Sequence, residues 1–216
     1  MTCQEKSAIC NTGLDGLRIT GILVQLLREA FQPGNVLSPR LEGCKWVPKE
    51  DSPLIEDPTK STILIESVYR WDPRVIGQRP GILVRRSEQS LARIGLGADK
   101  LQTFGLQSLT TPVGGGDIHA TPVQGSHMVF CIAREAGTVE VLATEVYRFL
   151  HQFAPVFEKE FSFLKFHVAQ IGSIAQLQES DEHFAVPIQV VYAYFEQWKL
   201  IQVAPKLATV SLQMET

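Results

Sequence analysis

Residues 184–198 read FAVPIQVVYAYFEQW, and their alternation constrains the fold more than any other segment does. The apolar positions along one side are Val186, Ile188, Val190, Tyr192 and Tyr194. Successive side chains of a strand point to opposite faces, so this period of two predicts a strand with one buried face. A sheet face of this kind needs a second layer of structure to cover it.

Four other segments are expected to supply neighbouring strands. They are residues 61–71, 82–89, 125–135 and 163–178, each rich in β-branched or aromatic residues. The first two are joined by about ten residues in a turn-rich stretch, so we expect them to pair antiparallel. The acidic segment 179–183 is expected to link the last two strands.

Two amphipathic helices are expected to form the covering layer. Residues 14–31 repeat apolar side chains at spacings of three and four, with Asn11, Thr12 or Asp15 as the cap. A second apolar face begins after Thr138, the expected cap, and Pro155 is expected to bend or end that helix. Its apolar residues are Val139, Leu142, Val146, Phe149, Leu150 and Phe153.

The order of these elements predicts an α+β fold: a mainly antiparallel sheet with two helices packed on one face. Residues 14–200 are expected to form one domain, with an arm at 1–13 and a tail at 201–216. Five prolines between residues 33 and 60 predict a long extended loop there. Trp46 within this loop suggests that the loop docks on another surface.

The segment 69–89 concentrates arginine. Arginines occur there at Arg70, Arg74, Arg79, Arg85 and Arg86. Residues 70–93 carry six arginines against two acids, a local charge of +4, although the whole chain carries −3. This asymmetry favours a basic patch that faces another subunit or a nucleic acid, or else a solvated arginine-rich strand.

Motifs for catalysis and cofactor binding are missing from the sequence. The glycines at 114–116 lack the Gly-Lys-Ser/Thr of a phosphate-binding loop. Asp117, His119 and His127 are the only candidates for a metal site, and their spacing is a weak signal. We therefore expect no enzyme activity and no cofactor, with a small metal-dependent enzyme as the alternative.

The sequence also bears on compartment and on nucleic acid. The four cysteines, Cys3, Cys10, Cys44 and Cys131, form no metal-binding pair and favour reduced thiols, with a later inter-subunit disulfide left open. We expect neither a secretory signal nor a transmembrane segment. Non-specific contact with a DNA backbone is possible for the basic stretch, but no sequence-reading motif occurs.

The second half of the chain resembles a layout found in tailed-phage neck and tail proteins. The matching pieces are Ala143-Thr144-Glu145-Val146 with Phe149 and Leu150, then Ile171-Gly172, then Glu179 to Asp181, then Val186-Pro187-Ile188 through Tyr194. The amphipathic segment 14–31 and the PGILVRR strand at 80–86 also suit this layout. The family in question comprises tail terminator and tail-completion proteins.

This resemblance implies a virion structural protein assembled in the host cytoplasm. Such a protein forms a homo-oligomeric ring, expected to be a hexamer, at the head–tail junction. Its partners would be the head connector and the tail-tube or sheath proteins. Arg70, Arg74, Arg79, Arg85, Arg86 and Trp46 are then the expected subunit-interface residues, because arginine pairs bidentately with a neighbour's carboxylates. A non-phage adaptor domain with the same fold is a further alternative.

Overall fold

The computed structural model describes residues 9–11, 14–35, 39–70, 79–91, 116–177 and 180–201. The chain divides into two compact units. The first, called the core unit here, comprises residues 14–92 and 122–194. The second comprises residues 1–13, 93–121 and 195–216, so the expected domain at 14–200 includes parts of both units.

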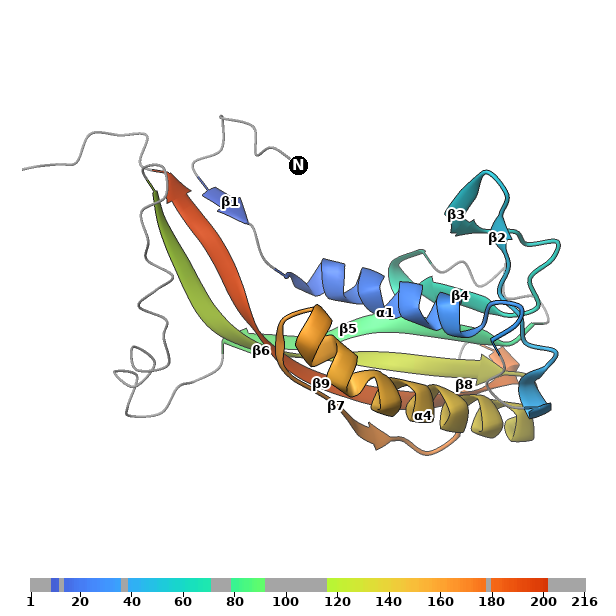
Figure 1. Ribbon diagram of the computed structural model, residues 1–216. Helices are drawn as coiled ribbons and strands as arrows, with labels where there is room; N and C mark the ends of the chain where they lie inside the picture. Colours follow the sequence, from blue (N-terminus) through green and yellow to red (C-terminus); the bar gives the residue numbers. More distant parts are fainter. Residues whose placement is uncertain are drawn as a thin grey trace, which may run out of the picture. The chain divides into compact units, whose positions relative to one another are not determined.

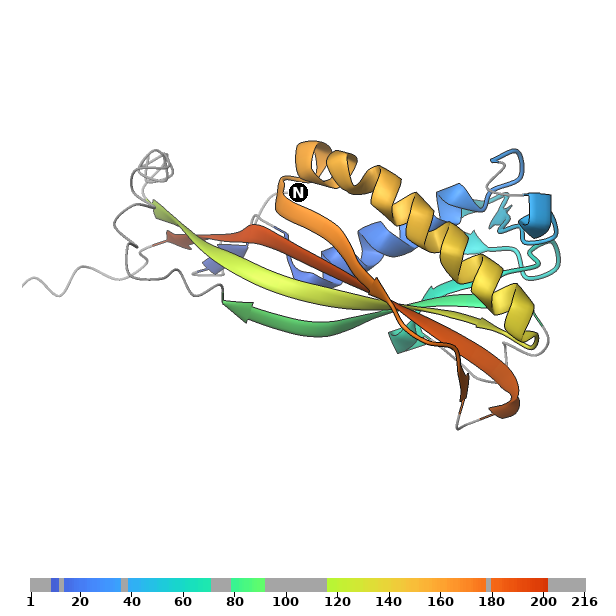
Figure 2. The ribbon, with the colours of Figure 1, turned by 90° about the horizontal axis from the view of Figure 1, so that it is seen from below.

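The core unit is a sheet covered by two helices, and the predicted α+β class is confirmed. Helices α1 (Gly16–Ala30) and α4 (Ala136–Glu160) lie over the same face of the sheet (Figures 1 and 2). The strands are β4 (Leu64–Ser67), β5 (Gly81–Leu91), β6 (Gly116–Ala133), β7 (Phe163–Ile171), β8 (Ala175–Leu177) and β9 (Ser180–Ile201). Hydrogen bonding gives the order β9-β6-β5-β4, and β7 and β8 both pair with β9.

Strand β9 confirms the strongest prediction. All five alternating residues between Val186 and Tyr194 are buried beneath the helices, in one core with residues such as Leu23 and Leu142. The opposite face of the sheet buries a smaller cluster, made of Leu64, Leu83, Ile132 and Ala185. The helix-covered face therefore holds most of the core.

Helix α1 matches its prediction within a residue or two, and Asp15 is the cap. The Asp15 carboxylate accepts a hydrogen bond from Arg18 N at 2.7 Å, which satisfies one of the free amides of the first turn. Its buried apolar residues, including Ile19, Leu23 and Leu27, recur at three- and four-residue spacing.

Helix α4 is longer at both ends than predicted. Its cap is Glu135, and Thr138 lies inside the first turn, where its hydroxyl donates to the Glu135 carboxylate at 3.1 Å. Pro155 does not end the helix, which continues to Glu160. The last turns are held by Phe157, which is fully buried and stacks on Phe166 with 3.8 Å between ring centroids.

The expected antiparallel pairing of residues 61–71 with 82–89 is wrong, because β4 and β5 are parallel. The reason is that β4 ends at Ser67 and a 3-10 turn, η2 (Val68–Arg70), follows it. Residues 68–80 then form the connection, which meets the dozen or so residues that a parallel return requires. Arg85 and Arg86 therefore lie on a strand that runs parallel to its neighbour β4.

The segment 33–60 contains more regular structure than the extended loop predicted, and the predicted link at 179–183 is wrong. The segment 33–60 contains a 3-10 turn, η1 (Pro39–Leu41), and a small antiparallel hairpin of β2 (Pro48–Lys49) and β3 (Ser52–Glu56). Proline is tolerated in both strands because this sheet has only edge strands. The expected link at 179–183 lies almost wholly within β9, and residues 172–174 separate β7 from β8 instead.

The second unit is described only in part. Strand β1 (Ile9–Asn11) pairs antiparallel with the end of β9, with Ile9 opposite Leu200 and Asn11 opposite Trp198. The expected arm at 1–13 therefore contains one paired strand. The expected tail at 201–216 lies outside the described residues after Ile201.

Candidate functional site

Arg79, one of the predicted interface residues, is engaged within the chain. Its Nη1 lies 2.5 Å from the Glu56 carboxylate and also donates to the Ser61 carbonyl at 3.3 Å. Both charged side chains of the pair are mostly buried. Arg79 therefore ties β3 to the chain that precedes β5.

Trp46 is also engaged within the chain, and its side chain is fully buried. The Arg28 guanidinium lies 5.0 Å from the centre of its ring, in a cation–π contact. Arg28 in turn pairs with Glu66 at 2.5 Å and donates to the Leu54 carbonyl at 2.8 Å. The predicted docking of the 33–60 segment is thus made onto α1, and Trp46 offers no surface to another subunit.

Arg85 and Arg86 differ from these internal arginines. Both are exposed on β5, and no carboxylate of the described residues lies within 4.0 Å of either guanidinium. Arg74 and the side chain of Arg70 lie outside the described residues. Of the predicted interface residues, Arg85 and Arg86 are the described ones that remain available to a partner.

Gly16 explains how the Arg86 side chain is positioned. A Cβ at Gly16 would lie 2.9 Å from both Arg86 Cδ and Gln89 Oε1. The absence of a side chain therefore lets Arg86 lie across the first turn of α1. The contact between Arg86 Nη1 and Gln89 Oε1, at 3.5 Å, is long and contributes little orientation.

Beneath Arg86 lies a buried polar cluster centred on His127. The Thr20 hydroxyl donates to the Gly16 carbonyl at 2.9 Å, so its oxygen accepts from His127 Nε2 at 2.8 Å. This assigns the proton to Nε2 and leaves Nδ1, buried and without a partner, as an acceptor. Burial, and secondarily the charge of Arg86, lowers the pKa of His127 to about 4.

The surface above this cluster is hollowed. A hollow of about 270 Å³ is lined by Gly16, Leu17, Thr20, Tyr69 and Arg86. The side chains of Leu17 and Tyr69 are 71% and 63% exposed, so they leave apolar surface uncovered beside Arg86. A guanidinium that forms no ion pair among the described residues, and that lies beside Leu17 and Tyr69, suits a carboxylate on a partly apolar segment.

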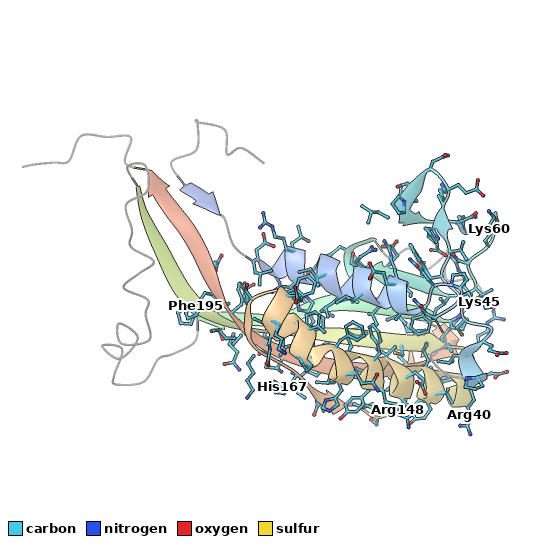
Figure 3. All side chains as sticks on the ribbon, in the orientation of Figure 1. Arg40, Lys45, Lys60, Arg148, His167 and Phe195 are labelled. Atoms are coloured by element: carbon cyan, nitrogen blue, oxygen red, sulfur yellow. The ribbon has the colours of Figure 1, made fainter. Side chains whose placement is uncertain are left out.

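A second hollow, of about 460 Å³, lies between η1 and α4. Its lining is Arg40, Glu140, Val141, Thr144, Glu145 and Arg148. Figure 3 shows Arg40 and Arg148 near the same end of the core unit. Arg148 pairs with Glu145 at 3.1 Å, and no lining residue is a histidine, cysteine or serine. We assign this hollow no chemistry.

The alternative metal site is not assembled among the residues that the structure describes. His127 is held by Thr20, while the side chains of Asp117 and His119 lie outside the described residues. Within the described ranges, no three metal-binding side chains come together.

The described thiols are unpaired. Cys131 is fully buried and Cys44 is half-buried, and burial raises the pKa of both thiols. A raised pKa disfavours the reactive thiolate. Cys3 and the side chain of Cys10 lie outside the described residues.

No protein-family profile matches the chain, and no curated protein matches its sequence. None of the helices in the described ranges is long and apolar enough to cross a membrane. A function for this chain must therefore be inferred from its fold, from the exposed Arg85 and Arg86, and from the hollow beside Arg86. The two arginines were identified from the sequence, but the hollow was not. Leu17 belongs to the apolar spacing of α1 in the sequence, and its 71% exposure appears only in the structure, so no signal for the hollow was present in the sequence.

Proposed function

We propose that this chain is a virion structural protein that forms a homo-oligomeric ring at the head–tail junction of a tailed phage. As a tail terminator or neck subunit, it closes the tail tube and joins it to the head connector. The ring is expected to be a hexamer. Its function is association with copies of itself and with connector and tail-tube or sheath proteins.

The observation that carries this proposal is the contrast among the arginines. Arg28 and Arg79 are paired inside the chain, whereas Arg85 and Arg86 are exposed with no carboxylate nearby among the described residues. A guanidinium pairs well with carboxylates in protein interfaces. The order of helices and strands, which resembles that of tail-completion proteins, adds support.

The test is to image the purified chain by electron microscopy and to measure its mass by sedimentation. We expect closed rings, and we expect the double variant Arg85→Glu/Arg86→Glu to stay monomeric while it unfolds at the temperature of the wild type. A wild-type chain that stays monomeric at every concentration, alone and in assembled particles, would overturn the proposal.

A further inference from the structure

The β2–β3 hairpin carries a second uncovered surface. Its two-residue turn is Glu50–Asp51, since Lys49 pairs with Ser52. Leu54 and Ile55 on β3 are 63% and 52% exposed. In Figure 1 the hairpin lies beside the end of α1 that is opposite to Gly16.

Of the two acidic residues at this turn, Glu50 forms an ion pair and Asp51 forms none among the described residues. Glu50 pairs with Lys60 at 3.1 Å, and Figure 3 shows Lys60 close to the hairpin. Asp51 is exposed, and no cation of the described residues lies within 4.0 Å of its carboxylate. The tip therefore presents a free carboxylate next to exposed aliphatic side chains.

The hairpin is held firmly at its base. Arg28 donates to the Leu54 carbonyl at 2.8 Å, and Arg79 pairs with Glu56 at 2.5 Å. Asp57 N also donates to the Val47 carbonyl at 2.8 Å and closes the base. A segment that is already ordered loses less conformational entropy when it binds.

We propose that the β2–β3 hairpin of one copy docks in the hollow lined by Leu17, Tyr69 and Arg86 on the next copy. The Asp51 carboxylate meets the Arg86 guanidinium, and Leu54 packs between Leu17 and Tyr69. The two surfaces are complementary: Arg86 lies between apolar side chains and Asp51 lies beside an aliphatic side chain, and neither forms an ion pair among the described residues. The inference rests on the proposed function, because it names the contact between ring subunits.

The positions of the two surfaces agree with a ring. They lie toward opposite ends of α1, which has 15 residues and is about 22 Å long. A contact between two different surfaces is heterologous, and it generates rings where the rotation closes. The hollow is also smaller than the roughly 300–1,000 Å³ of typical small-molecule sites, which suits a few side chains.

Charge exchange tests the contact. At pH 8, we expect Arg86→Glu and Asp51→Arg to weaken self-association at least tenfold each, and we expect the double variant to recover most of it. The matched controls are Lys165→Glu and Glu160→Arg, exposed charges on β7 and α4. Sedimentation velocity gives the association, and circular dichroism melting shows whether each monomer folds.

An apolar substitution provides an independent variant. Leu54→Ser is expected to weaken association by about tenfold, whereas Leu164→Ser, at a comparably exposed position on β7, is expected to leave it unchanged. If the wild type forms rings but Arg86→Glu and Asp51→Arg form them equally well, the docking contact is wrong and the ring proposal stands. Loss in both single variants without recovery in the double variant also overturns the pairing. A wild type that never assembles overturns the proposed function itself.

Discussion

His127 is a buried histidine, and burial is the main reason that its positively charged form is disfavoured. From α1, the Thr20 hydroxyl oxygen accepts a hydrogen bond from Nε2, and the Gly16 carbonyl, which favours the charged form, is close by. From β5, Arg86 places a positive charge near the ring, and from β9 the Tyr192 ring lies 5.4 Å away. The unpartnered Nδ1 is the atom that a second proton would occupy. The imidazole is therefore neutral in the folded protein at pH 7.

This environment makes stability depend on pH. The folded-state pKa of His127 is about 4, below the ordinary 6.5, so the unfolded chain binds a proton that the folded chain does not. The contribution of the neutral His127 to the free energy of unfolding is fully present above pH 6.5. It falls as the pH drops toward 4 and does not change further below that pH. From this pKa shift, we expect the free energy of unfolding of the wild type to fall on the order of 3 kcal/mol more than that of His127→Gln between pH 7 and pH 4. Urea unfolding at several pH values measures the difference.

The Gln variant is a suitable reference because its amide can still donate to Thr20. Other groups that titrate in this range affect both proteins equally, so the difference between them reports on His127. Parallel pH curves for the two proteins would contradict a buried neutral histidine.

Gly125 on β6 is required by the ring of Tyr192. A Cβ at Gly125 would lie 2.7 Å from both Cε2 and the hydroxyl oxygen of Tyr192, whose side chain is fully buried. Gly125→Ala should therefore destabilise the fold by roughly 1–3 kcal/mol through overpacking. Gly21→Ala is the control, because that position in α1 has open space and alanine favours a helix by about 1 kcal/mol. The midpoint temperature of thermal unfolding should fall for Gly125→Ala and rise for Gly21→Ala. A shift in the same direction for both variants would contradict this packing.

At the scale of elements, the end of α4 depends on one aromatic side chain. Phe157 stacks on Phe166 and meets Phe163 edge to face, with 5.8 Å between the latter pair of centroids. Phe157→Ala should lower the free energy of unfolding by about 3–5 kcal/mol. It should also speed amide exchange after Pro155, since proline weakens the helix there. Val156→Ala, at an exposed position, should change neither the free energy of unfolding nor the rate of amide exchange after Pro155. Equal exchange in both variants would show that Phe157 does not hold this turn.

The success of each sequence prediction followed the strength of its local pattern. Strand β9 was predictable because every second residue from Val186 to Tyr194 meets the helices. Strand β7 was harder, because irregularities between Phe163 and Lys165 and between Val168 and Gln170 interrupt its alternation. Phe163 and Phe166 thus share a buried environment, while Leu164 is half-exposed.

Pairing partners were less predictable than the strands themselves. The parallel pairing of β4 with β5 depends on where β4 ends, and the apolar residue Val68 gives no stop signal at Ser67. In the candidate site, sequence singled out Arg86 by composition alone. Gly16 and Tyr69 come from distant parts of the chain, so only the folded core unit brings them to Arg86.

At the scale of the whole molecule, the internal and the exposed arginines differ in what they contact. Arg28 of α1 and Arg79 before β5 fasten the 33–60 segment to the rest of the core unit and hold the base of the β2–β3 hairpin. Arg85 and Arg86 do not contribute an ion pair to the folded chain within the described residues. If the proposed ring forms through Arg85 and Arg86, substitutions at these residues should weaken assembly without removing an ion pair of the folded chain within the described residues.

This separation predicts different responses to salt. The Debye length falls from about 10 Å at 0.1 M to about 3 Å at 1 M, so an exposed contact between Arg86 and Asp51 weakens as salt rises. We expect the wild-type association constant to fall several-fold over that range, and the Leu54→Ser variant to show the same salt slope from a weaker start. The thermal midpoint of the monomer should change little, because the Arg28–Glu66 pair is largely buried. Sedimentation equilibrium at four salt concentrations gives the slope. Association that strengthens with salt would show that apolar contact, rather than charge pairing, holds the copies together.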